Sequence, residues 1–319
     1  MKIGYFSGFT PITALSPQRF ERAKTFLRQH DVQLIAGKLT GKSDGYRSGS
    51  IQGRADEINT LIHEDTIDVI MAAIGGTVTS SVLPYLDCSY LEQHPKTIVD
   101  YSDATALLLA IQTHAPSCRV IYGPALVASF GEWSPYVEET WIYFEKILMA
   151  DGPVTVNAPA SWTDEQANWE VFEHPKRQYP NKWHYLGEPR IKGRLMGGNL
   201  NTMYGFFKSA YFPELKHNDI LFIKDAEKDA ATVEKNFSML KLAGVFDQVR
   251  GIILGKHACF DSDGTHYQPI DILQEVLNGQ QLPIIYDFDS CHTIPMISTP
   301  LGSQVVIDAL KQTITFSIF

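Results

Sequence analysis

The hydrophobic positions in the first half of the chain form short apolar runs that alternate with amphipathic segments. Hydrophobic residues spaced three or four apart predict helices over 16–30, 54–64 and 104–113. The apolar runs between them predict buried strands over 2–7, 32–36, 68–74, 97–100 and 120–122. Strands that alternate with helices in this way favour a parallel sheet covered by helices on both faces.

The pattern changes between residues 151 and 189, where five prolines and three tryptophans interrupt any helical or strand period. We interpret residues 151–190 as a linker followed by a long Trp-rich substrate loop. Beyond residue 190 the pattern predicts two helices, over 229–242 and 270–277. It also predicts five strands, over 191–195, 220–223, 251–254, 284–286 and 303–307. We therefore expect an α/β protein with domains over 1–150 and 191–319, although a single large barrel also fits 319 residues.

Composition excludes several classes of function. Lys and Arg number 27 against 36 Asp and Glu, and this net charge of −9 makes the chain a poor binder of nucleic acid. No apolar run approaches the roughly 20 residues of a membrane helix, and the N-terminus does not resemble a signal peptide. The four cysteines are too far apart for a zinc site or a disulfide scaffold. These features predict a soluble, cytoplasmic protein.

Candidate chemistry lies in two loops that follow predicted strands, where ligands of open α/β sheets bind. Ser102 sits between the strand ending at Asp100 and the helix that follows it. Either Ser102 or Asp103 caps that helix, or Ser102 is a nucleophile on a strand-to-helix turn. The flanking residues do not match G-x-S-x-G, so the common hydrolase turn is absent from this sequence.

The second loop contains Gly75 and Gly76. Two adjacent glycines allow close approach of the backbone and leave N–H groups that suit an oxyanion hole, although a plain tight turn is an equal alternative. A phosphate loop is not supported, since G-x-G-x-x-G does not occur and the glycine stretch 193–198 continues with Asn199 and Leu200 instead of Lys and Ser or Thr.

His292 follows a predicted strand end, where a structural and a catalytic histidine are equally expected. The other histidines form no HExxH motif, and the residues around Asp261 lack the later ligands of a calcium loop. The sequence therefore predicts no metal site and no cofactor.

Trp162, Trp169 and Trp183 lie in the Trp-rich loop. Aromatic side chains in a long loop either bind flat ligands or anchor the loop to the core. Among the three we expect Trp183 to contact a ligand, because Lys182 and His184 flank it with groups suited to phosphate or sulfamate.

The order of these motifs resembles the LD-carboxypeptidase family of serine peptidases, and specifically its microcin C immunity branch. The segments that carry the resemblance span nearly the whole chain: IGYFSGFTP near the N-terminus, DGYRSGSIQGRADEIN (44–59), IGGTVTSSVLPYLD (74–87), DYSDATALLLAI (100–111), MGGNLNT (196–202), ILFIKD (220–225), GIILGKH (251–257) and DFDSCHTIPMISTPLG (287–302). The long Trp-bearing loop favours the immunity branch over the cell-wall carboxypeptidases.

The resemblance implies a Ser–His–Glu triad between an N-terminal Rossmann-like domain and a smaller C-terminal α/β domain. It places Ser102 as nucleophile, His292 as general base, and the backbone amides of Gly76 and Asp103 as the oxyanion hole. Substrate contacts are expected at Gly75, Trp183 and Asn199. The family pattern L-F-x-E-D reads Leu221-Phe222-Ile223-Lys224-Asp225 here, so Lys224 stands at the position of the acidic triad member.

A lysine at this position changes the chemistry, because a triad carboxylate accepts a hydrogen bond from the base and lysine has no acceptor. Lys224 has three possible explanations. The lysine was introduced to trap a ligand, the chain is a naturally inactive relative, or Asp225 or Glu227 takes over the role of the carboxylate.

The resemblance implies amide cleavage through an acyl-enzyme, on aminoacyl or peptidyl nucleotides such as processed microcin C, with Lys224 impairing this chain. The alternatives are a muramoyl-tetrapeptide LD-carboxypeptidase of cell-wall recycling and a non-catalytic relative that sequesters its ligand. The implied partner is a small-molecule substrate, with no nucleic acid and no membrane, and the implied assembly is a homodimer.

Overall fold

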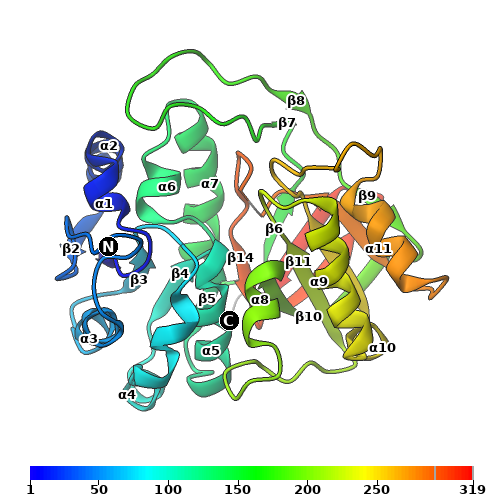
Figure 1. The fold of residues 1–319 in the computed structure, drawn as a ribbon, viewed down its shortest axis with the longest axis horizontal. Helices are drawn as coiled ribbons and strands as arrows, with labels where there is room; N and C mark the ends of the chain where they lie inside the picture. The colour runs from blue at the N-terminus through cyan, green and yellow to red at the C-terminus, as the bar shows by residue number, and fades with distance from the viewer. Residues whose placement is uncertain (291, 318–319) are drawn as a thin grey trace.

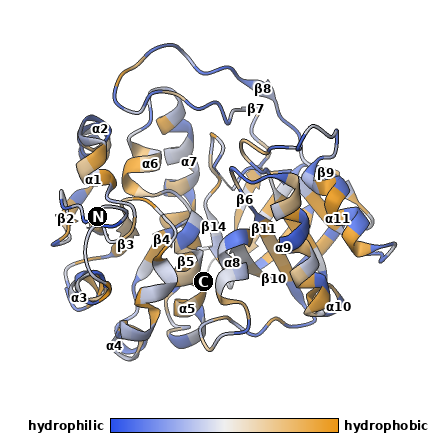
Figure 2. Ribbon diagram, viewed as in Figure 1, coloured by the Kyte–Doolittle hydropathy of each residue, from blue (hydrophilic) through white to orange (hydrophobic). Residues whose placement is uncertain are grey.

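The chain forms two large β-sheets that lie side by side, each packed against its own helices (Figure 1). The computed structural model describes residues 1–290 and 292–317. Hydrophobic residues line one side of most surface helices and face the sheets (Figure 2).

The first sheet contains the predicted strands of the first half, in the order β14-β5-β4-β3-β1-β2. Five strands are parallel neighbours, and β14 pairs antiparallel with β5 at one edge. Strands β3 and β4 are buried along their whole length, as their uniform apolar runs predict. The bounds are β1 Lys2–Phe6, β2 Gln33–Ala36, β3 Val69–Ala72, β4 Thr97–Asp100, β5 Arg119–Tyr122 and β14 Thr299–Leu301.

The helices of this half include the three that the sequence predicts, at α2, α3 and α5, and several that it does not. The longest addition is α7, which buries residues with helical spacing, from Val137 through Trp141 and Phe144 to Leu148. The bounds are α1 Ile12–Leu15, α2 Pro17–Gln29, α3 Ile51–Ile62, α4 Cys88–Gln93, α5 Thr105–His114, α6 Leu126–Phe130 and α7 Tyr136–Leu148, with short 3-10 helices η1 Thr79–Tyr85 and η2 Ser102–Ala104.

The second sheet has the order β6-β16-β15-β10-β11-β12-β13-β9. Its centre, from β10 to β13, is parallel, and the outer strands pair antiparallel. Helices α9 and α11 pack against each other beside it (Figure 1). The bounds are β10 Arg190–Asn199, β11 Asp219–Lys224, β12 Gly251–Gly255, β13 Ile284–Phe288, β15 Gln304–Asp308, β16 Thr313–Ser317, α8 Leu200–Phe206, α9 Ala230–Leu242, α10 Val245–Gln248 and α11 Pro269–Leu277.

The interpretation of residues 151–190 as a linker without regular structure needs correction. Strand β6 (Val154–Asn157) pairs with β16, and β9 (His184–Leu186) pairs with β13, so both edges of the second sheet come from this region. Strands β7 (Ser161–Trp162) and β8 (Tyr179–Pro180) pair with each other. These strands are two to four residues long, too short for a hydrophobic period to reveal them.

Helix α5 lies between the two sheets, which explains its uniformly apolar sequence. All residues from Thr105 to Ile111 are buried, against the first sheet on one side and against α8 and β10 on the other. Gly198 permits this contact, because a Cβ there would lie 2.6 Å from Cγ2 of Thr105. The amide of Asn199 donates to Oγ1 of Thr105 at 2.9 Å, so β10 and the start of α5 are directly bonded.

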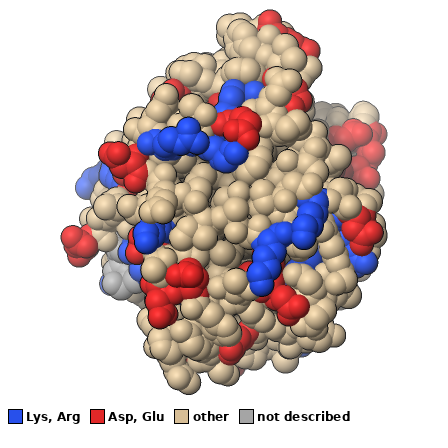
Figure 3. Space-filling view, turned by 90° about the vertical axis from the view of Figure 1, so that its left-hand side faces the viewer, with Lys and Arg blue, Asp and Glu red and all other residues tan. Residues whose placement is uncertain are grey.

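The predicted fold class is confirmed: a parallel-sheet N-terminal half is joined to a second α/β sheet. Lys, Arg, Asp and Glu side chains are interspersed over the face shown in Figure 3. Within the described residues, no helix combines the length and apolar character needed to cross a membrane.

Candidate active site

Ser102 occupies a tight turn between β4 and α5. Its φ of 60° lies in the left-handed region, which costs a non-glycine residue about 1–2 kcal/mol. The turn is secured on both sides of this residue. The Ser102 amide donates to the hydroxyl of Tyr122 at 3.1 Å, and the Thr105 hydroxyl donates to the Ser102 carbonyl at 2.7 Å. The surrounding structure therefore holds Ser102 in a strained and defined orientation.

The Gly75–Gly76 loop lies directly against this turn. A Cβ at Gly75 would lie 2.9 Å from Cβ of Ser102 and 3.3 Å from the amide nitrogen of Asp103, so glycine is required for the close approach. Within the described part of the chain, the N–H of Gly76 has no acceptor.

The side chain of Asp103 connects the turn to the residues that follow the glycines. Its Oδ2 accepts hydrogen bonds from the backbone N–H and the hydroxyl of Thr79, at 2.9 and 2.7 Å. The Asp103 side chain is therefore bonded to Thr79. The Asp103 amide lies in the first turn of a helical segment, where N–H groups have no partner within the helix.

His292 reaches Ser102 from the other half of the protein. It follows β13, and its Nε2 lies 3.1 Å from Oγ of Ser102. The ring is half-buried and tilts against Tyr101, with 4.9 Å between the ring centroids. The structure thus brings together two residues 190 positions apart in the sequence.

Lys224, the last residue of β11, is fully buried and lies on the opposite side of the His292 ring. Its Nζ is in hydrogen-bond contact with Nδ1 of His292. The ammonium group also lies 5.8 Å from the ring centroids of both Tyr101 and Tyr122. Ser102, His292 and Lys224 therefore form a continuous row of contacts.

The electrostatic environment disfavours the protonated form of His292. Burial, and then the positive charges of Lys224 and Lys228, hold the pKa of His292 well below its ordinary value. A carboxylate in the same place would have the opposite effect on the pKa of the ring.

The carboxylate of Asp225, next to Lys224 in the sequence, is bonded to Asn199 and to two backbone amides. Its Oδ1 accepts hydrogen bonds from Nδ2 of Asn199 and from the Ala226 amide, at 3.2 and 3.0 Å, and its Oδ2 accepts the Asn201 amide at 3.0 Å. These bonds hold the carboxylate at the N-terminus of α8. Glu227 is exposed, lines the pocket next to the site and has a φ of 55°.

The expectation that Asn199 contacts the substrate is wrong for its side chain. Asn199 is 6% exposed and is the N-cap of α8, with its Oδ1 accepting the Thr202 amide at 2.9 Å. Because its amide group also donates to Asp225, both ends of the side chain are used inside the protein.

The choice of Trp183 as the ligand-binding tryptophan also needs correction. Trp183 is 1% exposed, and its ring packs on Phe288 with 5.3 Å between centroids. Its Nε1 donates to Oδ2 of the buried Asp289 at 2.7 Å. Trp183 therefore anchors the start of β9 to the core of the second sheet.

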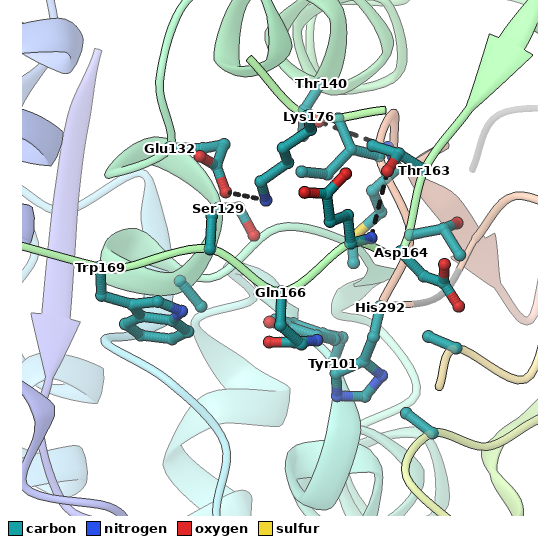
Figure 4. Close-up of a pocket in the computed structure, with 18 of the residues that line it drawn as sticks. Tyr101, Ser129, Glu132, Thr140, Thr163, Asp164, Gln166, Trp169, Lys176 and His292 are labelled. Carbon is teal, nitrogen blue, oxygen red and sulfur yellow. Dashed lines mark hydrogen bonds and ion pairs between the residues drawn. The ribbon is translucent and has the colours of Figure 1, made fainter. Parts of the chain in front are cut away.

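Trp169 lines a pocket that opens beside His292. Figure 4 shows Tyr101 and His292 together at one end of this pocket and Trp169 at its side. The guanidinium of Arg19 stacks on the Trp169 ring at 4.0 Å from its centroid. Trp169 was one of three candidate tryptophans, and the polar neighbours of Trp183 favoured Trp183 over it.

A buried charge cluster forms another wall of the pocket. Arg19 and Lys176 both donate to Oε2 of Glu132, at 3.0 and 2.8 Å. Figure 4 shows the contact between Lys176 and Glu132. Burial raises the pKa of the Glu132 carboxyl, but attraction by Arg19 and Lys176 outweighs it and leaves the pKa below its ordinary value. The cluster thus carries one net positive charge.

The site has the components of serine-based acyl transfer: a strained serine on a strand-to-helix turn, a histidine in contact with it, and backbone amides beside a glycine pair. Among residues 1–290 and 292–317, no group of three or more His, Cys, Asp or Glu side chains is arranged to hold a metal ion.

Comparison with known proteins assigns this architecture to a family. Residues 6–123 match the N-terminal domain of LD-carboxypeptidases and residues 192–307 match their C-terminal domain. The chain belongs to the LD-carboxypeptidase family.

Within this family the chain lies in the branch of the microcin C7 self-immunity protein MccF of Escherichia coli, with 45% identity over 310 residues, covering 96% of this chain and 90% of MccF. The wild-type MccF structure without ligand superimposes with a TM-score of 0.96 at 44% identity, covering 99% of this chain and 95% of that one. A Vibrio cholerae protein, provisionally named as a carboxypeptidase, is 48% identical over 308 residues, covering 96% of this chain and 92% of its own. The resemblance predicted from the sequence is thereby confirmed.

Proposed function

We propose that this chain is a serine hydrolase that cleaves the amide of aminoacyl or peptidyl nucleotides, such as processed microcin C, and that Lys224 strongly impairs it. The 3.1 Å contact between Ser102 Oγ and His292 Nε2, on a strained turn beside Gly75 and Gly76, carries this proposal. It is the arrangement that nucleophilic catalysis by serine requires.

In the proposed reaction, Ser102 Oγ attacks the scissile carbonyl and passes its proton to Nε2 of His292. The N–H groups of Gly76 and Asp103 stabilise the oxyanion of the tetrahedral intermediate, helped by the positive end of α5. His292 then protonates the leaving amine, and water hydrolyses the acyl-enzyme by the same steps in reverse. None of these steps requires a metal or a cofactor.

The pocket between His292 and Trp169 supports a substrate with both an acyl and a flat, nucleoside-like part. Trp169 offers an aromatic surface, and the Arg19–Lys176–Glu132 cluster offers positive charge. Solved structures show MccF, a relative, in complex with aspartyl sulfamoyl adenosine and with glutamyl sulfamoyl guanosine. Ligands of this class therefore suit a first test.

Lys224 is expected to reduce turnover because it cannot accept the hydrogen bond by which a carboxylate orients the base. Losing the correct hydrogen bond to the base of such a triad lowers turnover on the order of 10⁴-fold, while ground-state binding persists. We therefore expect this chain to bind its substrate and to hydrolyse it very slowly.

Single-turnover hydrolysis of aspartyl sulfamoyl adenosine tests this function. Lys224→Glu should raise the rate by a factor on the order of 10⁴, with little change in affinity measured by calorimetry. Ser102→Ala in the Lys224→Glu background is the control and should abolish the gain. If the parent chain already matches Lys224→Glu, another group orients His292 and the assignment of Lys224 is wrong.

A non-catalytic binding protein is the second candidate, and the Lys224–His292 contact favours it. If Lys224→Glu binds the nucleotide and still does not cleave it, this candidate replaces the enzyme. A murein tetrapeptide is the comparison substrate, and its preferential cleavage by Lys224→Glu would instead indicate a cell-wall carboxypeptidase. The family resemblance extends the proposal to a cytoplasmic homodimer, whose assembly sedimentation equilibrium would test.

A further inference from the structure

We propose that Lys224 holds His292 in the tautomer that carries its proton on Nε2, so that the imidazole donates a hydrogen bond to Ser102 instead of accepting its proton. This inference rests on the proposed roles of Ser102 and His292. It describes the site before substrate binds, and it explains the impairment as an inverted hydrogen-bond direction.

The two ring nitrogens of His292 face different partners. Nδ1 faces the Nζ of Lys224, and Nε2 faces Oγ of Ser102 at 3.1 Å. The hydroxyl of Ser102 can either donate or accept, so it adapts to whichever form the imidazole takes. The lysine side of the ring therefore determines the direction of both hydrogen bonds.

A neutral imidazole has one N–H and one bare nitrogen, whereas a lysine ammonium has three donors and no acceptor. Contact between Nζ and Nδ1 is favourable only if Nδ1 is bare, which leaves the proton on Nε2. The doubly protonated ring would place an N–H against the ammonium. Burial and the charges of Lys224 and Lys228, which lower the pKa of His292, oppose that form.

Packing around Lys224 keeps its side chain beside the imidazole. The side chain is fully buried, and its Nζ lies 5.8 Å from the ring centroids of Tyr101, just after β4, and of Tyr122, at the end of β5. A Cβ at Gly255 of β12 would lie only 2.7 Å from Cβ of Lys224, so the two strands are in close contact there.

Titratable groups near Lys224 come from several elements. His257, after β12, interacts electrostatically with both Lys224 and Asp225, and burial together with the charge of Lys224 lowers the pKa of His257 to about 4 against the opposing influence of Asp225. Asp225, next in sequence, has its carboxylate held by Asn199 and two backbone amides. Nδ1 of His257 lies 3.1 Å from the carbonyl oxygen of Gly255.

The inverted tautomer has a direct chemical consequence. With Nε2–H donating to Oγ, the Ser102 proton has no acceptor on the histidine, and the hydroxyl donates into the pocket instead. The base-competent tautomer, with Nδ1–H and bare Nε2, becomes favourable only when Lys224 loses a proton and its amine can accept.

Long-range ¹H–¹⁵N correlation spectra of the ligand-free protein test the inference, because they distinguish a protonated from a bare ring nitrogen. The chain contains 10 histidines, so His292→Asn serves to assign the signals. We expect His292 to be protonated at Nε2 in this chain near pH 7 and at Nδ1 in Lys224→Glu. Lys224→Met, which neither donates nor accepts, should give a mixture of the two tautomers.

A ring protonated at Nδ1 in this chain, or the same tautomer ratio in this chain and in Lys224→Met, would overturn the inference. Because these spectra need no substrate, their outcome is separate from that of the proposed hydrolysis. If the tautomers behave as expected and Lys224→Glu remains inactive, the inference stands and the proposed function fails. If Lys224→Glu is active and the tautomers do not differ, the proposed function stands and the inference fails.

Discussion

At the scale of single residues, Trp169 and Trp183 of the 151–190 region differ in how far they are buried. Trp183 is enclosed and its Nε1 is bonded to Asp289, so its ring has no free surface. Trp169 is half-buried, lines the pocket beside His292, and is held by Arg19 stacked on its ring.

We expect Trp169→Ala to weaken binding of an adenylate analogue by about 1–3 kcal/mol, the usual contribution of an aromatic stacked on a base. Calorimetric titration of Trp169→Ala and the parent chain measures this loss. Trp183→Phe is the matched control, since it should lower stability through the lost bond to Asp289 and leave binding unchanged. Equal loss of affinity in both variants would mean that neither ring stacks on the ligand.

Sequence reasoning predicted part of the site, and its failures have physical causes. Ser102, His292 and Lys224 could be placed together only through the family resemblance, because no local pattern joins residues so far apart. Trp183 was misjudged because its polar neighbours suggested exposure. In an extended segment alternate side chains point to opposite faces, so exposed Lys182 and His184 accompany an inward-facing Trp183.

At the scale of elements, residues 163–176, here called the strap, connect the two halves across the pocket. One end exchanges two backbone hydrogen bonds of 2.9 Å between Thr163 and Ile294. Toward the other end, Glu170 accepts the amides of Gln18 and Arg19 at the N-terminus of α2, at 3.0 and 3.3 Å. The strap thus supplies the cap that this helix lacks in its own sequence, since the Ser16 side chain makes no capping bond.

We expect Glu170→Ala to loosen the strap, because removing a capping carboxylate costs about 1 kcal/mol. The readout is limited proteolysis, with faster cleavage within residues 163–176 than in the parent chain. Glu173→Ala is the control, because Glu173 is exposed and accepts a hydrogen bond from Asn168 within the strap itself. Identical cleavage of the two variants would show that Glu170 does not hold the strap.

Element prediction succeeded where burial is uniform or clearly one-sided. The apolar runs at β3 and β4 and the patterned helices α2 and α9 were found from sequence. Strand β14 was missed since three residues with a central proline carry no period, and its partner β5 lies about 180 positions away. Helix α7 was missed because aromatic and β-branched residues, which are weak helix formers, occupy much of its buried face.

At the scale of the whole molecule, one buried carboxyl links stability to pH. Glu57 of α3 is 1% exposed and accepts the amides of Ser7 and Leu39, which follow β1 and β2, at 3.1 and 2.8 Å. Burial raises the pKa of Glu57 to about 7, although these two hydrogen bonds lower it. Its pKa in the unfolded chain lies near the ordinary glutamate value.

Because the folded state binds more protons than the unfolded state between about pH 4.5 and 7, the Glu57 contribution to stability decreases as pH rises through this window. The loss should reach about 3 kcal/mol at full ionisation. Urea unfolding at pH 5 and pH 8 should show this decrease in the parent chain relative to Glu57→Gln. If the difference in unfolding free energy between the parent chain and Glu57→Gln does not change with pH, the prediction is wrong.

Strand β14 has a consequence for how the molecule can be assembled. The chain leaves the first sheet after β5, forms most of the second sheet, and returns so that Thr299–Leu301 completes the edge of the first. Strands β15 and β16 are then added to the second sheet. A ribosome that has made only residues 1–150 has therefore produced a sheet with an open edge. His292 lies on the returning segment, a few residues before β14. The segment that closes the edge of the first sheet therefore also carries His292 to its contact with Ser102, so residues 1–150 alone contain Ser102 without His292.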